Sequence, residues 1–546
     1  MRTRILAALL LFTFTQAALA DPADAAMSTI HPEAIRADMR FLSDDLLEGR
    51  GIGSRGYDIA AKFMATQFES LGLQAAGDNG TYFQSVPLRS MKVDESKSSF
   101  IIARGGKEET LTSRVDYILG ADAGRPDVFV EAPIVFVGFG VTAPSQNYDD
   151  YKGIDAKGKI VAYLFGAPHF DSSLKAHYTS STVKAENAVK HGAVGVIVLN
   201  TPILEKMYSF SERVRDLAIP RYRWLDKQGQ PNDYVPEQKC VLSLSLDATK
   251  KFLEGSPHSA DEVFAAAKAG KPVSFDLPLT AKIHTVTDSK DMQSPNVAGK
   301  LEGSDAKLKE EYVVYTAHLD HLGIATPVKG DNIYNGALDN ASGSAIILEI
   351  ARAFSKMNPR PRRSILFVSV TAEEAGLLGS DYFAHYPTVP KSSLAANINI
   401  DEDLMLWPMA DVVAFGAEHS SLANVVKNAA DRMHLTQSPD PIPEQVIFIR
   451  SDQYSFVKQG VPALAPSPGF KSDDPKIVPS DILEKWEETR YHQPQDDMDQ
   501  PGLDFEAATK FARFAFLCGY LVTEKIQRPT WNKGDFFGDL YGHKSE

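Results

Sequence analysis

Five side chains that can bind a metal or move a proton stand at corresponding places in the second half of the sequence. They are His318, Asp339, Glu373, Glu374 and Asp401. All but Asp339 closely follow an apolar stretch. One such residue after an apolar stretch would be typical of an ordinary loop. Imidazole and carboxylate groups are also the ligands that zinc uses when cysteine is not available. Their repetition at three successive strand ends predicts a metal site.

The adjacent pair Glu373 and Glu374 allows a division of labour. One carboxylate can bind a metal while its neighbour accepts and releases protons. The pair closely follows the apolar run over residues 365–370, which is typical of a core strand rather than of a solvated turn. We therefore expect both carboxylates to lie inside a site.

The elements that must position these residues alternate along the chain. Apolar runs predict strands over residues 311–317, 363–371 and 395–400, and the intervening and final patterns predict helices over 340–355 and 505–522. Strands that alternate with helices indicate a doubly wound α/β fold with a mixed sheet. In such sheets the functional site forms beyond the carboxyl ends of the strands, where the candidate residues stand.

A segment in the first half of the chain has a different pattern. Strands are predicted over residues 134–139, 159–164 and 195–199, and the segment is expected to end near Lys271. This part of the chain could form a small α/β or β-rich unit inserted into the larger domain.

The N-terminus has the pattern of a secretory signal peptide over residues 1–20. Arg2 and Arg4 precede a short apolar run, and Ala18-Leu19-Ala20 is typical of a cleavage site. The run is shorter than the roughly 20 residues that span a membrane. We predict an exported protein with no integral membrane segment after signal removal, either periplasmic or secreted.

Composition excludes some classes of protein. The chain has 546 residues, a net charge of −14 and a pI of about 5.5. This charge argues against a nucleic-acid binder, which would show a basic face. Cys240 and Cys518 are the only cysteines, so a cysteine metal site is excluded. Cys518 lies in an apolar helical pattern that favours a packed thiol, although pairing of the two stays open.

Five short motifs stand in a characteristic order. They are His318-Leu319-Asp320, residues 336–343, Thr371-Ala372-Glu373-Glu374, Asn399-Ile400-Asp401 and Tyr491-His492. With these motifs the chain resembles the co-catalytic zinc aminopeptidases of metallopeptidase family twenty-eight. Residues 42–50 and 450–452 add to the resemblance, and residues 133–200 resemble a protease-associated domain. The implied organisation is a catalytic domain over residues 21–125 and 273–546 with a protease-associated domain inserted over 126–272.

The resemblance implies a centre with two zinc ions per chain. The implied ligands are His318, Asp339, Glu374, Asp401 and His492. Asp339 would bridge both ions, His318 and Asp401 would complete one site, and Glu374 and His492 would complete the other.

Two further roles follow from the same resemblance. Asp320 would accept the second N–H of the His318 ring and so hold the ring in place. Glu373 would be the general base for a water shared by the two ions, and later the proton donor to the leaving amine.

The implied function is removal of residues from the free N-terminus of peptides, which are the expected partners. A carboxypeptidase or dipeptidase on the same centre is the alternative, because the ligands serve both. A single-zinc glutaminyl cyclase and a non-enzymatic receptor fit less well, because all five ligands and Glu373 are present. The oligomeric state stays open.

Some residues depart from the family's pattern. Glu402 stands where relatives often carry Met, and Asp403 follows it. These carboxylates could favour a substrate α-ammonium or a basic side chain, or could face solvent. Gln453 stands where His is frequent, and Tyr454 beside it is a candidate contact to the substrate or oxyanion.

Two other patterns are assigned no part in metal binding or nucleotide binding. Residues 51–56 spell G-x-G-x-x-G, but a nucleotide loop needs a preceding strand, and residues 36–47 predict a helix. His321 adjoins a metal motif, and we expect it to donate hydrogen bonds around the site rather than to bind metal.

Overall fold

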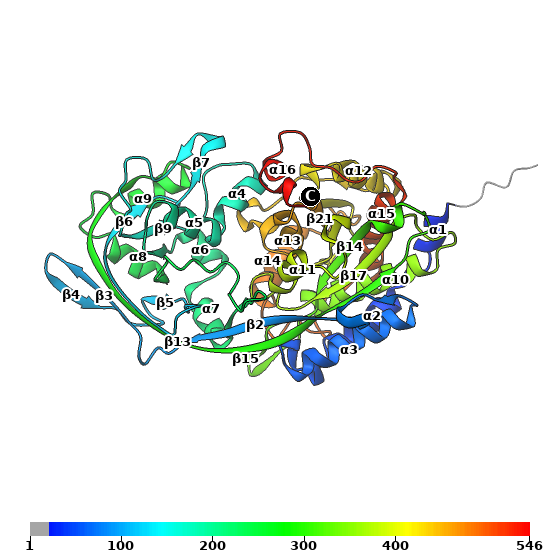
Figure 1. Ribbon diagram of the computed structural model, residues 1–546, viewed down its shortest axis with the longest axis horizontal. Coiled ribbons are helices and arrows are strands. Elements are labelled where there is room, and N and C mark those ends of the chain that lie inside the picture. The colour runs from blue at the N-terminus through cyan, green and yellow to red at the C-terminus, as the bar shows by residue number, and fades with distance from the viewer. Residues whose placement is uncertain (1–20, 546) are drawn as a thin grey trace, which may run out of the picture.

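The computed structural model describes residues 21–545. Two lobes lie side by side and are joined along one edge by the long strands β2 (Phe83–Val93) and β13 (Ser274–Leu301) (Figure 1). The predicted signal peptide, residues 1–20, lies outside the described residues. Between residues 21 and 545 no helix combines the length and the apolar character needed to cross a membrane.

The first lobe is built on a mixed sheet with a parallel centre. Strand β14 (Tyr312–His318) pairs in parallel with β17 (Ser364–Val370) on one side and with β18 (Leu394–Asn399) on the other. Strand β18 also pairs in parallel with β21 (Ala463–Pro468), which pairs antiparallel with β19 (Asp411–Phe415). The three predicted strands that precede the site residues are therefore neighbours.

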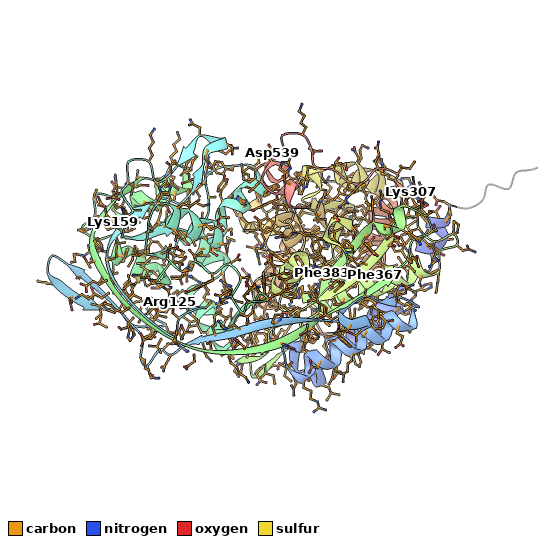
Figure 2. All side chains as sticks on the ribbon, viewed as in Figure 1. Arg125, Lys159, Lys307, Phe367, Phe383 and Asp539 are labelled. Carbon is orange, nitrogen blue, oxygen red and sulfur yellow. The ribbon has the colours of Figure 1, made fainter. Side chains whose placement is uncertain are left out.

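Helices cover both faces of this sheet. One layer contains α2 (Pro32–Leu42), α3 (Arg55–Ser70), α10 (Gly343–Ser355) and α15 (Phe505–Glu524). The other contains α11 (Leu378–His385), α13 (Gln453–Lys458) and α16 (Phe536–Tyr541). Successive residues of a strand point to opposite faces, so each face of the sheet has its own core. Phe367 of β17 packs in the core of the first layer, and Phe383 of α11 packs in the core of the second. Both residues are labelled in Figure 2. The prediction of a doubly wound mixed sheet is confirmed.

Strand β13 links the two lobes. Its 28 residues would span about 90 Å at roughly 3.3 Å per residue. Its first part pairs with β6 (Asp127–Val137) and β3 (Ser99–Arg104), its middle with β2, and its last residues with β17. One strand thus belongs to the sheets of both lobes.

The second lobe has a sheet of its own around parallel strands. Strand β9 (Ile160–Leu164) lies between β6 and β10 (Gly195–Leu199), and β10 pairs in parallel with β12 (Val241–Leu244). The helices of this lobe are α4 (Ser172–Thr179), α5 (Ser181–Lys190), α6 (Pro202–Met207), α7 (Phe210–Arg215), α8 (Leu246–Phe252) and α9 (Ala260–Lys268). Its core takes in side chains from Phe100 to Ile283. The boundary at 126–272 stays a prediction, and the shared strand β13 begins just after its C-terminal end, at Ser274.

The remaining elements are shorter or peripheral. The helices are α1 (Pro22–Met27), α12 (Leu422–Arg432) and α14 (Pro479–Thr489). The strands are β1 (Gln74–Ala75), β4 (Lys107–Thr110), β5 (Tyr117–Leu119), β7 (Thr142–Ala143), β8 (Tyr148–Asp149), β11 (Arg221–Trp224), β15 (Gly323–Val328), β16 (Asp331–Tyr334) and β20 (Thr436–Gln437). Cys240 and Cys518 are both free and buried.

The helix predicted over residues 36–47 ends earlier, at Leu42. A tight turn over Asp45–Arg50 follows it, and Glu48, Gly49 and Arg50 have φ values of 50°, 65° and 50°. The helix ends because Asp44 is extended, with φ −72° and ψ 141°, and its side chain accepts the backbone N–H of Leu46 to start this turn. The turn folds back towards the site instead.

Candidate metal centre

The candidate residues meet at one edge of the first lobe's sheet. His318 is the last residue of β14, Glu373 and Glu374 follow β17, and Asp401 follows β18. These three strands are parallel neighbours, so their carboxyl ends lie together. Asp339 comes from the turn Ala337–Ser342 that precedes α10.

The turn before α10 explains why the helix begins later than predicted. The chain predicts a helix from residue 340, but α10 begins at Gly343. Asn340 stays in the turn, and its side-chain oxygen accepts a hydrogen bond of 2.9 Å from the backbone N–H of Gly343. A short polar side chain thereby satisfies one free N–H at the helix start, and the turn directs Asp339 towards β14.

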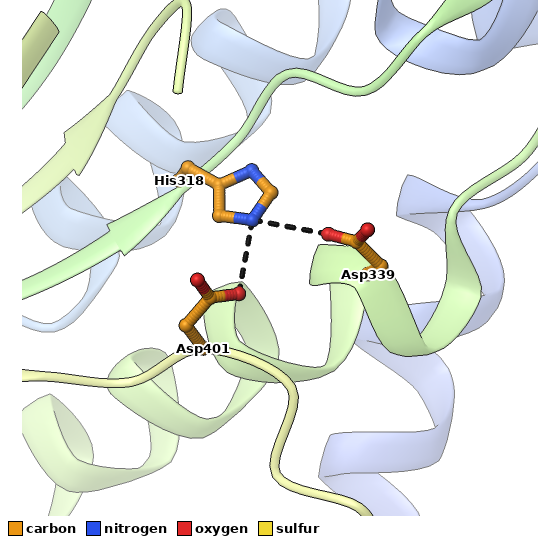
Figure 3. Close-up of side chains that lie close together, drawn as sticks. All are labelled: His318, Asp339 and Asp401. Atoms are coloured by element: carbon orange, nitrogen blue, oxygen red, sulfur yellow. Dashed lines mark hydrogen bonds and ion pairs between the residues drawn. The ribbon is translucent and has the colours of Figure 1, made fainter. Parts of the chain in front are cut away.

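One group of close side chains surrounds His318. Its Nε2 lies 3.1 Å from Asp339 Oδ1 and 3.0 Å from Asp401 Oδ1 (Figure 3). The other oxygen of Asp401 accepts a hydrogen bond from the hydroxyl of Ser451. His318 and Asp339 are buried, Asp401 is partly buried, and the three ligand atoms lie within 4.8 Å of one another.

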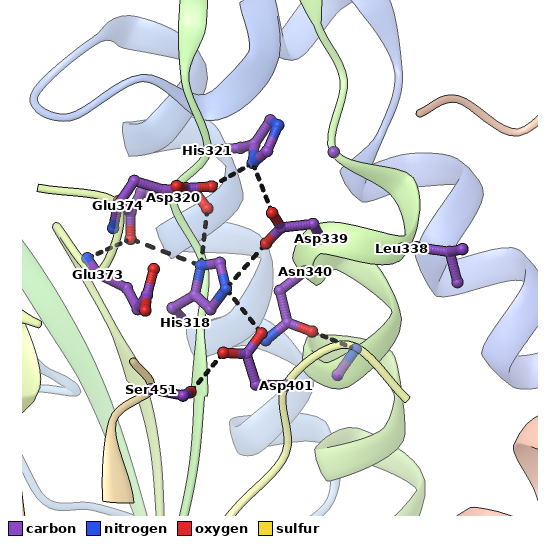
Figure 4. A network of polar contacts seen from close by, with 12 residues as sticks. His318, Asp320, His321, Leu338, Asp339, Asn340, Glu373, Glu374, Asp401 and Ser451 are labelled. Carbon is purple, nitrogen blue, oxygen red and sulfur yellow. Dashed lines mark hydrogen bonds and ion pairs between the residues drawn. The ribbon is translucent and has the colours of Figure 1, made fainter. Parts of the chain in front are cut away.

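A second group surrounds Glu374. His492 Nε2 lies 3.1 Å from Glu374 Oε2 and 3.2 Å from Asp339 Oδ2. His321 Nδ1 lies 2.6 Å from Glu374 Oε1 and 3.8 Å from Asp339 Oδ2 (Figure 4). Asp339 therefore directs one oxygen to each group, which is the position of a carboxylate shared between two sites.

The donor set fits a metal. Imidazole nitrogens and carboxylate oxygens are zinc ligands, and three groups of three such residues each bring their ligand atoms within 4.8 Å. Although burial raises it, the imidazoles of His321, His318 and His492 hold the pKa of Asp339 well below its usual value. Asp339 is thus ionised, which is the form in which a carboxylate binds a metal.

Glu373 differs from its neighbour in environment. Burial raises the pKa of the Glu373 carboxyl well above its usual value; His318 lowers it, and Asp401 raises it further. Its backbone N–H donates to Asp320 Oδ1 at 3.1 Å, so the main chain is held while the carboxylate faces the cavity. A carboxyl with a raised pKa is suited to accept and release a proton near neutral pH.

Asp320 has a different contact from the one expected. Its carboxylate lies 4.0 Å from His318 Nδ1, and the His318 ring instead contacts the backbone oxygen of Asp320 at 3.1 Å. The carboxylate accepts the backbone N–H groups of Glu373 and Glu374, at 3.1 and 3.4 Å. Asp320 therefore positions the glutamate pair, because its backbone already satisfies the imidazole.

Both lobes line a cavity of about 1400 Å³ that contains the centre. Tyr163, Lys184 and Tyr208 reach it from the second lobe. Arg215 of the second lobe donates a hydrogen bond of 3.4 Å to the backbone oxygen of His492. Access to the centre therefore passes between the lobes.

The structure adds detail for three residues near the centre. His321 contacts Glu374, as expected of a residue that makes hydrogen bonds around the site, and it also belongs to one of the groups of side chains that could hold a metal ion. Arg450 donates to the hydroxyl of Tyr491 at 2.9 Å, and both line the cavity. Both stand in motifs that carry the family resemblance, but the sequence alone assigns neither of them a role in the site.

The hydroxyl of Tyr454 has a partner in the second lobe, and the residue also lines the cavity. Its hydroxyl lies 2.9 Å from His177 Nδ1 in the second lobe. Gln453 is fully buried, and its side-chain amide donates to the backbone oxygen of Phe448 at 2.9 Å. Both residues hold structure around the centre.

The fold and the site define a doubly wound α/β protein with an imidazole–carboxylate centre at the carboxyl edge of its sheet. Residues 296–517 match the family model described as Peptidase family M28. This segment runs from the end of β13 into α15 and includes every candidate site residue. Over these residues the chain is similar to peptidase family M28.

Similar proteins are known in solved structures and among curated sequences. The aminopeptidase from Aneurinibacillus sp. strain AM-1 shares the fold, with a TM-score of 0.51 and 20% identity over 93% of this chain and 99% of that one. Aminopeptidase NAALADL1 of Rattus norvegicus is 25% identical over 372 residues, or 60% of this chain and 44% of that protein. Carboxypeptidase Q of Bos taurus is 25% identical over 267 residues, or 48% and 45%. This chain thus spans less than half the length of either curated relative.

Proposed function

We propose that this protein is an exported exopeptidase with two zinc ions, and that it removes the residue at the free N-terminus of peptides. The observation that carries the proposal is the position of Asp339. It directs one oxygen to the group of His318 and Asp401, and the other to the group of Glu374 and His492. A carboxylate shared by two ligand groups is suited to hold two metal ions close together.

In this proposal Asp339 would contribute to both ions, His318 and Asp401 would hold one, and Glu374 and His492 would hold the other. His321, which also contacts Glu374, would be a further ligand of the second ion. When bound, the zinc pair would supply Lewis-acid polarisation of the peptide carbonyl and a lowered pKa for water.

The chain's own residues would manage the proton. Glu373 would take the proton from the attacking water and deliver it to the nitrogen of the leaving amine, for which its buried carboxyl is suited. Asp320 would keep the backbone of Glu373 in place through the hydrogen bond to its N–H. The hydroxyl of Tyr491, which Arg450 orients, faces the same cavity and could donate to the substrate carbonyl oxygen.

The alternative is a carboxypeptidase or dipeptidase on the same centre, and the similarity to carboxypeptidase Q supports it. The metal ligands alone do not choose between the two directions. A carboxypeptidase would need a cation near the centre for the substrate carboxylate, and Arg450 and Arg215 both line the cavity beside His492 and Tyr491. Arg215 is paired with Asp216 at 3.0 Å. Arg450 is already engaged by Tyr491, and the nearby Glu402 favours a substrate amine instead.

The test is an assay of the zinc-loaded mature protein on aminoacyl amides with free and acetylated N-termini. We expect hydrolysis of the free-amine substrates only, and two zinc ions per chain by elemental analysis. Glu373→Gln should lower kcat by about 10²–10⁴-fold and leave the zinc content unchanged, since proton transfer by a positioned group contributes about that factor.

Glu488→Gln is the matched control, because Glu488 is an exposed glutamate in the same cavity. It should keep full activity. Cleavage of acetylated peptides from the C-terminus would overturn the direction of the proposal. Full activity in Glu373→Gln would overturn the mechanism.

Export is proposed from the signal pattern over residues 1–20. Expression of the full chain, followed by cell fractionation and N-terminal sequencing, tests it. We expect the product to begin near Asp21 outside the cytoplasm, and an uncleaved cytoplasmic product would contradict the proposal.

A further inference from the structure

Glu402 is the residue after the candidate ligand Asp401, and its half-buried side chain lines the cavity that contains the centre. Within residues 21–545 the Glu402 carboxylate makes no hydrogen bond and no ion pair within 4.0 Å. A carboxylate in a partly desolvated cavity is costly unless something pairs with it. Glu402 is therefore able to receive a group from a molecule in the cavity.

The backbone around Glu402 directs it there. Glu402 and Leu404 have φ values of 46° and 44°, in the left-handed region that non-glycine residues enter at a cost. Such outliers concentrate where a loop must present a side chain to a ligand. Asp403, between them, is fully buried and does not line the cavity. The loop thus presents one of its two extra carboxylates and hides the other.

The charges around Glu402 indicate what it can bind. Its charged neighbours are Asp339, Asp401, His492 and Arg450. In the proposed centre the first three would be metal ligands, so their charges would be matched by the metal. Arg450 donates to the Tyr491 hydroxyl at 2.9 Å and lies beyond ion-pair distance from Glu402. No charged side chain among the described residues pairs with the Glu402 carboxyl, which leaves its oxygens open to a cationic group of the substrate.

We propose that Glu402 binds the cationic nitrogen of the substrate's N-terminal residue, and so determines which peptides the centre accepts. This inference rests on the proposed function and narrows its substrate class. The nitrogen has two possible sources with one chemistry: the α-ammonium that every free N-terminus carries, or the side chain of an N-terminal Lys or Arg. A charge-assisted hydrogen bond to a carboxylate serves either.

The experiment measures peptide binding without turnover. Zinc-loaded Glu373→Gln protein, with and without Glu402→Gln, is titrated calorimetrically with the dipeptides Lys-Ala, norleucine-Ala and their N-acetylated forms. Lysine and norleucine have side chains of similar length and differ in charge, and acetylation removes the α-ammonium charge. Glu402→Met serves as a second uncharged variant, and retained zinc content shows that each variant is folded around its centre.

If Glu402 binds the side chain, both lysine peptides should bind about tenfold or more weakly in the Glu402 variants, while the norleucine peptides are unchanged. If it binds the α-ammonium, both free-amine peptides should weaken by that factor and both acetylated peptides should not. If each of the four peptides binds with the same affinity to the proteins with and without the Glu402 substitution, the inference is overturned. An equal loss in the control Glu488→Gln would also overturn it, because the effect would then be one of overall cavity charge.

Hydrolysis of the same peptides by the wild-type protein separates this inference from the proposed function. Binding that depends on charge and on Glu402, without any hydrolysis, would refute the proposed exopeptidase function and support the role of Glu402. Hydrolysis of free-amine peptides whose binding does not depend on Glu402 would support the proposed exopeptidase function and refute the role of Glu402.

Discussion

Arg50 joins the N-terminal segment to the loops that carry the centre. Its side chain is fully buried, and its guanidinium donates to the backbone oxygens of Leu319 at 2.8 Å, Asn335 at 2.6 Å, Gly336 at 2.9 Å and Leu42. Burial lowers its pKa to about 10, so it stays charged at neutral pH. Replacement by Met retains an unbranched apolar side chain at this position and removes every hydrogen-bond donor of the guanidinium.

The expected cost follows from these contacts. A hydrogen bond from a charged donor contributes about 1.5–3 kcal/mol, and a buried carbonyl left without a donor costs about 1–3 kcal/mol. The contacts share one side chain and are not additive. Loss of these bonds together, with the freed carbonyls partly rehydrated, costs about 4 kcal/mol on these figures. We therefore expect Arg50→Met to lower the free energy of unfolding by about 4 kcal/mol.

Urea unfolding followed by tryptophan fluorescence measures this cost, because Trp407 and Trp486 are buried in the same lobe. Arg40→Met is the matched control, since Arg40 is exposed on α2, and it should change the free energy by less than about 0.5 kcal/mol. A loss below about 1 kcal/mol in Arg50→Met would refute the reasoning. Zinc binding should weaken in parallel, because Leu319 directly follows the candidate ligand His318.

Two further perturbations test other parts of the structure. His419 lies 2.7 Å from Asp535 and 3.4 Å from Glu418, and although burial lowers it, these contacts raise its pKa from 6.5 to about 9. A pKa that is higher in the folded state stabilises the protein fully below pH 6.5, and this stabilisation is lost as the pH rises through 9. The difference in free energy of unfolding between the wild-type protein and His419→Asn, measured with urea, should therefore shrink by about 3 kcal/mol between pH 6 and pH 10. A difference that stays constant over this range would contradict the prediction. Removal of the metal with a chelator should lower the free energy of unfolding by about 4 kcal/mol relative to protein at free zinc 1000-fold above its Kd, as calorimetry would show, and equal stability with and without chelator would argue against a bound metal.

The sequence predicted the sheet and its functional edge because both depend on local patterns. Apolar runs over 363–371 and 395–400 coincide with β17 and β18 to within a residue or two. Parallel strands must end at the same edge, so His318, Glu374 and Asp401 were expected together and do lie together. Local hydrophobicity and strand order are sufficient for that much.

Only the tertiary structure decided which atoms face one another. The Asp320 carboxylate binds backbone N–H groups instead of the His318 ring, because the backbone oxygen of Asp320 already lies beside that ring. Glu402 lines the cavity while Asp403 is buried, because left-handed residues twist their loop. The hydroxyl of Tyr454 meets His177 of the second lobe, far away in sequence. Side-chain direction depends on φ values and on packing between distant segments, and neither is encoded in the spacing of residues along the chain.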